Sequence, residues 1–182
     1  MAEQPLSRTR LSLTGVVLLA EGAHLIWEHV HGGIVRHHVL HRSDLPAISN
    51  AWGVLLLPAL TWYLTGRIQR RMVPHCDGTQ AAAPVNVVVG FVGALMCGVL
   101  LAVAFTRHEG ALASSVFLAQ VLLALALPVY RAECVLGFVL GMTFTFGAVL
   151  PTAVGSLVAA LSAVVHLGVR PVLARLRTSL SG

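Results

Sequence analysis

The chain has 182 residues, of which 57% are hydrophobic and only 10% are charged. Soluble domains average roughly 45–50% apolar and 25% charged residues, so this composition is that of a multi-span membrane protein. The formal net charge is +5, but the arginines lie at the ends of apolar tracts and form no basic face. The charge therefore gives no support to nucleic acid as a partner.

Five long apolar tracts follow one another with short polar joints: Leu11–Val35, Ala47–Thr65, Pro84–Phe105, Ala111–Tyr130 and Cys134–Val169. A helix needs about 20 apolar residues to cross the hydrocarbon core of a bilayer. The last tract is long enough for two short crossings, with a hinge near Pro151 and Gly155. The sequence predicts an all-α, polytopic membrane helix bundle of one domain over residues 1–182. Six transmembrane helices are expected, with five as the alternative.

The basic residues indicate an orientation. All twelve are arginine, and the absence of lysine excludes a Schiff-base pigment of the retinal kind. With six crossings and the amino terminus inside, nine arginines fall inside and three outside, namely Arg36, Arg42 and Arg107. The positive-inside rule then predicts that both termini are cytoplasmic, in a bacterial inner membrane. Five helices would place the arginine-rich tail outside.

Two other readings of the chain are less favoured. The cysteines Cys76, Cys97 and Cys134 have no paired spacing, which argues against a disulfide or a cysteine metal site. Arginines precede the first apolar stretch as in a signal peptide, but hydrophobicity resumes past Glu21 without a small-residue cleavage site. We therefore expect this segment to remain as the first helix.

The first apolar tract carries a polar stripe. At 100° per residue, steps of four and three keep one set of residues on a single helix face: Arg10, Thr14, Val17, Glu21, His24, Glu28 and His31. His29 points away from this face. Ionisable groups in a lipid-spanning segment cost a few kcal/mol or more each, so they usually face a bundle interior and mark a functional site.

The spacing of the stripe limits its chemistry. Glu21 and His31 are about 15 Å apart along the axis, too far to share one ion. Neighbours three or four residues apart lie about 5–6 Å from each other, so Glu21 with His24, His24 with Glu28, and Glu28 with His31 form a ladder. Imidazole with carboxylate suits zinc, iron, nickel, cobalt or manganese. The same pair suits proton transfer, and pairing that only holds helices together is a further alternative.

The segment after the stripe holds three more histidines and an acid, His37, His38, His41 and Asp44. On the expected outer surface they form either a vestibule that collects metal ions or a solvated loop at the lipid headgroups. Asn50 opens the second tract at a depth where it can face His31 or Glu28. A bis-histidine haem site that joins His24 to His166 is not favoured, because no second histidine pair supports it.

Two local likenesses involve the stripe. His24, Glu28 and His29 resemble the intramembrane histidine–acid signature of nickel and cobalt permeases, with a spacing one residue shorter and glutamate in place of aspartate. The run from His24 to Glu28, followed by 50–52 and Pro58, is similar to parts of the emopamil-binding-protein sterol isomerases. That resemblance implies a histidine and glutamates that move a proton across a sterol double bond, although the helices between the two parts are missing here.

A third likeness lies in the outer loop. His37, His38 and His41 resemble one histidine box of the membrane di-iron desaturases and hydroxylases, whose full set of boxes this chain lacks. None of the three likenesses identifies a family.

The favoured hypothesis is a small membrane protein that binds or transports a divalent transition-metal ion, with protons as candidate co-ions. The alternative is a membrane-embedded enzyme that acts on a lipid- or sterol-like substrate, with His24 and Glu28 as acid and base or as metal ligands. A third hypothesis is an accessory subunit whose stripe docks a partner helix. The expected partners are the bilayer, the metal ion or lipid-like molecule, and a second copy of the chain, because six short spans enclose little volume.

Overall fold

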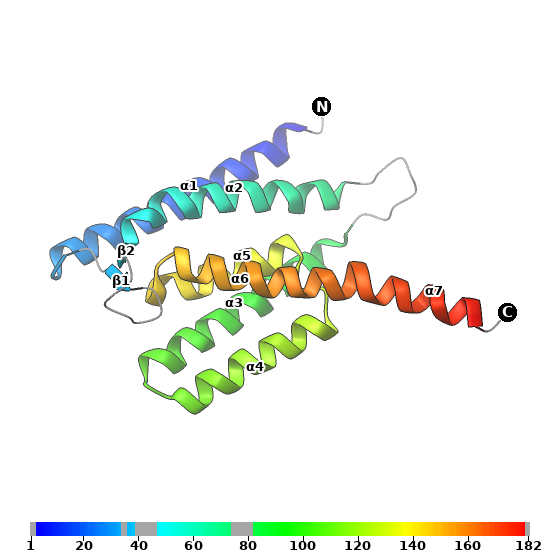
Figure 1. Cartoon of the computed structure of the whole chain (residues 1–182). Helices are drawn as coiled ribbons and strands as arrows, with labels where there is room; N and C mark the ends of the chain where they lie inside the picture. Colours follow the sequence, from blue (N-terminus) through cyan, green and yellow to red (C-terminus); the bar gives the residue numbers. More distant parts are fainter. Residues whose placement is uncertain (1–2, 34–35, 39–46, 74–81, 181–182) are drawn as a thin grey trace.

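A computed structural model describes residues 3–33, 36–38, 47–73 and 82–180 of the chain. These residues are almost wholly helical (Figure 1). In chain order the elements are α1 (Glu3–Val30), β1 (Arg36–His38), β2 (Ala47–Ser49), the 3-10 turn η2 (Asn50–Trp52), α2 (Gly53–Met72), α3 (Pro84–Thr106), α4 (Gly110–Ala126), α5 (Ala132–Phe146), α6 (Val149–Ala163), the π-helical segment η3 (Val164–Val169) and α7 (Arg170–Leu180). The all-helical fold class is thus confirmed, with one two-stranded ribbon as its exception.

The first helix begins earlier and ends earlier than the apolar tract predicts. It includes the polar residues before Leu11 and stops at Val30 instead of Val35. Gly32 and Gly33 follow with φ angles of 132° and 102°. Such backbone angles are strained for residues that carry a Cβ, so the glycine pair ends the helix.

The last apolar tract divides at a different point from the predicted hinge. The chain turns at Gly147, between α5 and α6, where φ is 68°. Pro151 and Gly155 both lie inside α6, so the predicted hinge position is wrong. Proline is tolerated in a first helical turn because the backbone N–H that it lacks has no partner there. Beyond α6, η3 and α7 continue the same rod without a turn.

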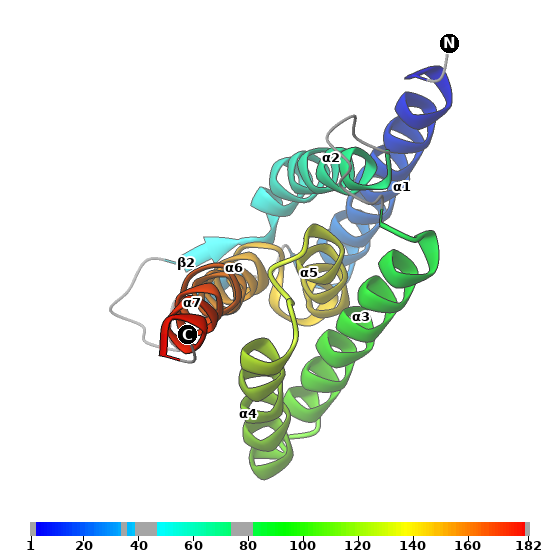
Figure 2. The same cartoon turned by 90° about the vertical axis from the view of Figure 1, so that its right-hand side faces the viewer.

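The fifth helix occupies the centre of the bundle. Figure 2 shows α5 with α1 and α2 on one side and α3 and α4 on the other, while α6 closes the remaining flank. A Cβ added at Gly137 or Gly141 would clash with the carbonyl oxygens of Phe91 and Leu95 on α3. The glycines therefore let α5 and α3 approach backbone to backbone.

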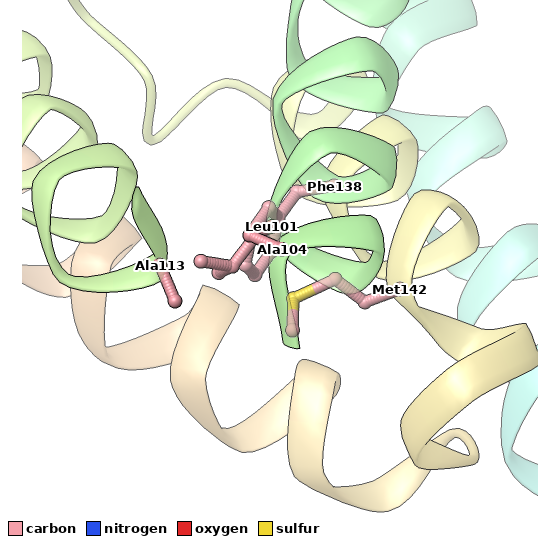
Figure 3. Close-up of a cluster of buried hydrophobic side chains, with 5 residues drawn as sticks. All are labelled: Leu101, Ala104, Ala113, Phe138 and Met142. Atoms are coloured by element: carbon pink, nitrogen blue, oxygen red, sulfur yellow. The ribbon is translucent and has the colours of Figure 1, made fainter. Parts of the chain in front are cut away.

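A small apolar core fills the space between α3, α4 and α5. Its buried side chains, shown in Figure 3, are Leu101, Ala104, Ala113, Phe138 and Met142. Many large apolar side chains elsewhere are exposed, and Leu19, for example, is 75% exposed. Large apolar side chains on the outside of the bundle suit a surface that faces lipid acyl chains rather than water.

Three helical segments are long and apolar enough to cross a membrane: Ser7–Val30, Pro84–Thr106 and Val149–Leu176. They are compatible with an integral membrane protein. α4 and α5 are shorter apolar helices, and the last turns of α2 carry arginines. Six crossings therefore remain a prediction. Figure 1 shows that α1 begins and α7 ends at the same end of the molecule.

A candidate acid–histidine site between α1 and α2

The first two helices run antiparallel and touch closely (Figure 1). Gly53 of α2 lies against the carboxyl group of Glu21, and Gly66 lies against the guanidinium of Arg10. Arg10 also donates from Nε to the carbonyl of Trp62 at 2.7 Å, and its Cζ sits 3.9 Å from the centre of the Trp62 ring. Glycines at both contact points leave room on α2 for polar side chains from α1.

The polar stripe faces this interface. Glu21 is 4% exposed and Glu28 is 6% exposed, while the side chain of His24 between them is 10% exposed. The ring of His24 also stacks on Phe144 of α5, with centroids 4.8 Å apart. We call Glu21, His24 and Glu28 the acid–histidine cluster.

His24 bridges the two carboxylates with its two ring nitrogens. Nδ1 lies 3.8 Å from Oε2 of Glu21, and Nε2 lies 3.6 Å from Oε1 of Glu28. Both distances suit ion pairs and exceed the usual hydrogen-bond length. Two of the three pairs expected from the spacing, Glu21 with His24 and His24 with Glu28, are thus present as a short chain of acid, imidazole and acid.

Asn50 contacts the Glu28 end of the cluster, one of the two contacts expected for it. Its Nδ2 donates to Oε1 of Glu28 at 2.7 Å, and Asn50 is 5% exposed. Its Oδ1 lies where a Cβ on Gly147 would stand. The glycine at the α5–α6 turn therefore gives the amide the room that it needs.

The carboxylate of Glu21 is incompletely satisfied. Its Oε1 is buried and has no hydrogen-bond partner among the described residues. A buried polar atom without a partner costs free energy in a low-dielectric surrounding. The cluster is therefore suited to gain a proton or another cation.

Three further histidines lie outside the cluster. His31 is exposed, its Nδ1 donates to the carbonyl of Trp27 at 2.8 Å, and its ring stacks on that of Trp27. His29 is exposed as well. His166 uses Nδ1 to donate to the carbonyl of Ser162 at 2.9 Å. The structure thus does not bring His31 or His166 to His24.

A short β-ribbon brings the segment that contains His37 and His38 toward the cluster. β1 pairs with β2 in antiparallel register, which sets His37 opposite Ile48 and His38 opposite Ala47. β2 leads directly into Asn50. The backbone of these two histidines therefore runs beside the segment that delivers Asn50 to Glu28. His41 and Asp44 lie outside the described residues.

Across the parts of the chain that the structure describes, no group of three or more histidine, cysteine, aspartate or glutamate side chains is arranged to hold a metal ion. Cys97 and Cys134 are free thiols. Among the described residues, a metal ion would therefore have only a pair of ligands within the acid–histidine cluster. Its remaining ligands would have to come from other groups.

Sequence reasoning missed a third buried acid. Glu133, in the first turn of α5, is 1% exposed, and Nη1 of Arg71 donates to its Oε1 at 2.9 Å and its Oε2 at 2.8 Å. The available signal was an acid at the very start of an apolar tract. The apolar tract begins only at the next residue, Cys134, so the acid stands outside it.

Two cavities border Glu133. One of about 490 Å³, which we call the inner cavity, lies between α1, α2, α3 and α5. The other, of about 470 Å³, lies between α3, α4, α5 and α6. An embedded lipid enzyme would need its substrate cavity beside His24, and His24 lines neither of these two.

No protein-family model, no curated protein and no solved structure matches this chain.

Proposed function

We propose that the protein is an integral membrane transporter whose acid–histidine cluster takes up and passes on protons. The observation that carries this proposal is the bridging position of His24, with one ring nitrogen toward each carboxylate. An imidazole can accept a proton at one nitrogen and release one from the other, and it does so near neutral pH. Carboxylates on both sides provide the next acceptor in either direction.

The unsatisfied Oε1 of Glu21 supports the same proposal. A buried carboxylate oxygen without a partner is costly inside a membrane, and a proton on the carboxyl group reduces that cost. A proton needs no further ligand, so the described residues suffice for it. The distances of 3.6 and 3.8 Å must shorten by less than 1 Å, or be bridged by water, for transfer to occur.

A proton-flux assay tests the proposal. The purified protein is placed in liposomes that contain a pH-sensitive dye, and a potassium diffusion potential drives protons inward. We expect Glu21→Gln and His24→Ala each to reduce the flux at least tenfold. His29→Ala is the matched control, because His29 is exposed on the same helix. Equal flux in wild-type and protein-free liposomes, or full flux in both cluster variants, would refute the proposal.

A divalent transition-metal ion is the second candidate cargo. The protein would carry it across a bacterial inner membrane. Its specific support is the β-ribbon, which runs the backbone of His37 and His38 beside Asn50. Two ligand atoms 3.6 Å apart, such as Nε2 of His24 and Oε1 of Glu28, can both lie about 2.1 Å from one ion. The loop histidines are then candidates for the remaining ligands.

Elemental analysis of the purified protein distinguishes the two cargoes. A metal site predicts a stoichiometric transition metal in the wild type, and its loss in Glu28→Gln and in a variant with both His37→Ala and His38→Ala. Proton transfer alone predicts no bound metal in any of these proteins. Retention of the metal in Glu28→Gln would exclude the cluster as its site.

A further inference from the structure

The cavity between α3, α4, α5 and α6 is polar at one end and apolar along the rest of its length. We call it the lateral cavity, and its volume is about 470 Å³. At the end where both α3 and α5 begin, its wall includes Asn86 of α3 and Arg131, which immediately precedes α5. Farther along, the lining residues are apolar apart from Gln120 and Cys97. Such a division suits an amphipathic ligand with a polar head and a hydrocarbon tail.

The polar end carries a positive charge that the described residues do not neutralise. Glu133 also lines this end, but Nη1 of Arg71 donates to both of its carboxylate oxygens, so these two charges cancel. Arg131 forms no ion pair with an acid in the described part of the chain. A guanidinium presents a fork of N–H donors that matches the oxygens of a phosphate group. The head of the ligand is therefore expected to be anionic.

The lateral cavity is open toward the outside of the bundle. Val89 of α3 lines it and is 65% exposed, and Leu123 and Leu127 of α4, which line it as well, are also exposed. Side chains with so much exposed surface cannot enclose a sealed chamber. In a membrane the medium at this surface is lipid, so an acyl chain can enter the cavity from the side.

The length of the cavity matches one leaflet of a bilayer. Asn86 and Cys97, both on α3, are eleven residues apart, which is about 16 Å along the helix axis. The hydrocarbon core is about 30 Å thick, so the acyl chains of one leaflet span about 15 Å. Because α3 is long and apolar enough to cross a membrane, its first turn would lie at the level of the lipid headgroups. A phospholipid in the cavity would keep its phosphate and its acyl chain at their ordinary depths.

We propose that the lateral cavity binds an acyl chain of an anionic phospholipid whose phosphate group pairs with Arg131. The side-chain amide of Asn86 is a second donor for the headgroup. Basic pockets between transmembrane helices are suited to anionic headgroups, whereas the cation of a zwitterionic choline headgroup would lie among the arginines of this end. The site is separate from the acid–histidine cluster, which lies between α1 and α2, and does not depend on the proposed transport function.

Lipid titration tests the recognition of the headgroup. Native mass spectrometry of the protein in detergent measures its affinity for phosphatidylglycerol and for phosphatidylcholine with identical acyl chains. We expect phosphatidylglycerol to bind the wild type at least fivefold more tightly, and Arg131→Gln to lose this preference. Arg70→Gln is the matched control, because Arg70 is an exposed arginine at the same end of the bundle and lines neither cavity. Equal affinities of the wild type for the two lipids would overturn the proposal.

The native thiols report where the lipid lies. Cys134 lines the polar end of the lateral cavity and Cys97 its apolar end. In a Cys76→Ser protein, peptide mass spectrometry follows the reaction of each thiol with N-ethylmaleimide in detergent. We expect saturating phosphatidylglycerol to slow both reactions at least fivefold. Unchanged rates at both thiols with the lipid bound would place it elsewhere and overturn the cavity as its site.

Filling the cavity provides an independent test. Gly93 lines it, and nothing lies within 4 Å of its Cβ position, so the side chain of Gly93→Leu would compete with the acyl chain for space. We expect at least fivefold weaker binding of phosphatidylglycerol. Gly22→Leu is the matched control, because Gly22 has the same free space but lines neither cavity. Wild-type affinity in a folded Gly93→Leu protein would contradict the proposal, and the thiol measurement decides if this variant does not fold.

Discussion

At the scale of single residues, the glycines decide where the acids of this protein can lie. Gly53 and Gly147 have no side chain, and the atoms next to them are the ends of polar side chains, Oε1 of Glu21 and Oδ1 of Asn50. A flexible side chain can move away from an added methyl group at low cost. Changes at these glycines should therefore affect the site more than the fold.

Gly53→Ala is expected to displace the carboxylate of Glu21 from His24. The new Cβ would overlap Oε1 of Glu21. Because a displacement of about 1 Å can reduce a positioned reaction by as much as 10²-fold, we expect proton flux to fall tenfold or more while thermal stability in detergent changes little. Gly22→Ala is the control, since nothing lies within 4 Å of its Cβ position. Unchanged flux in Gly53→Ala would show that the contact is irrelevant to transport.

The residue scale also explains what the sequence could and could not predict about the site. The buried face of α1 follows from helical periodicity, so Glu21, His24 and Glu28 could be placed together in advance. His31 would share that face by angle, but the helix has ended at Val30 and the ring of His31 stacks on Trp27 instead. The pairing of Glu133 with Arg71 joins α2 to α5 across 62 positions of sequence, which no local pattern predicts.

At the scale of helices, the tight contacts are between backbones, whereas the glycines of the site contact flexible side chains. The Cβ positions of Gly137 and Gly141 fall on carbonyl oxygens of α3, and a carbonyl oxygen cannot rotate away. The helical structure of α3 and α5 could be predicted from their apolar tracts. The turn between α5 and α6 could not, because Gly147 is one of several glycines there and only its positive φ distinguishes it.

Gly141→Ala is therefore expected to force α3 and α5 apart. Overpacking of a tight interface costs about 1–3 kcal/mol, and no side-chain movement relieves this clash. We expect a lower midpoint of thermal unfolding in detergent. Gly93→Ala, on α3 with nothing within 4 Å of its Cβ position, should keep the wild-type midpoint. Equal midpoints for the two variants would argue against the close approach of the helices.

The ion pair between α2 and α5 should contribute to stability in a similar way. Arg71→Gln leaves the carboxylate of Glu133 buried without its cation, which costs about 3–5 kcal/mol in fully buried pairs. Because the side chain of Arg71 is 35% exposed, we expect a loss at or below the lower end of that range. Arg70→Gln, at an exposed neighbour, should cost little.

A double-mutant cycle shows whether this loss comes from the pair. Arg71→Gln combined with Glu133→Gln should destabilise the protein by clearly less than the sum of the two single changes, because the uncompensated charge is gone. Additive losses would mean that the two side chains act independently.

At the scale of the whole molecule, the order of the helices determines which ends meet. Six consecutive rods, with α6, η3 and α7 counted as one, bring the start of α1 and the end of α7 to the same end of the bundle (Figure 1). The inner cavity and the pair of Arg71 with Glu133 lie toward that end as well, because α2 ends where α1 begins. The acid–histidine cluster lies toward the other end, near the β-ribbon.

The arginines add a direction to this arrangement. If all six rods cross the bilayer, the end that holds both termini also holds nine of the twelve arginines, and the positive-inside rule assigns it to the cytoplasm. Fusion of a reporter that fluoresces only in the cytoplasm should then give signal at either terminus, whereas a reporter active only outside should be silent at both. Opposite signals at the two termini would require an odd number of crossings.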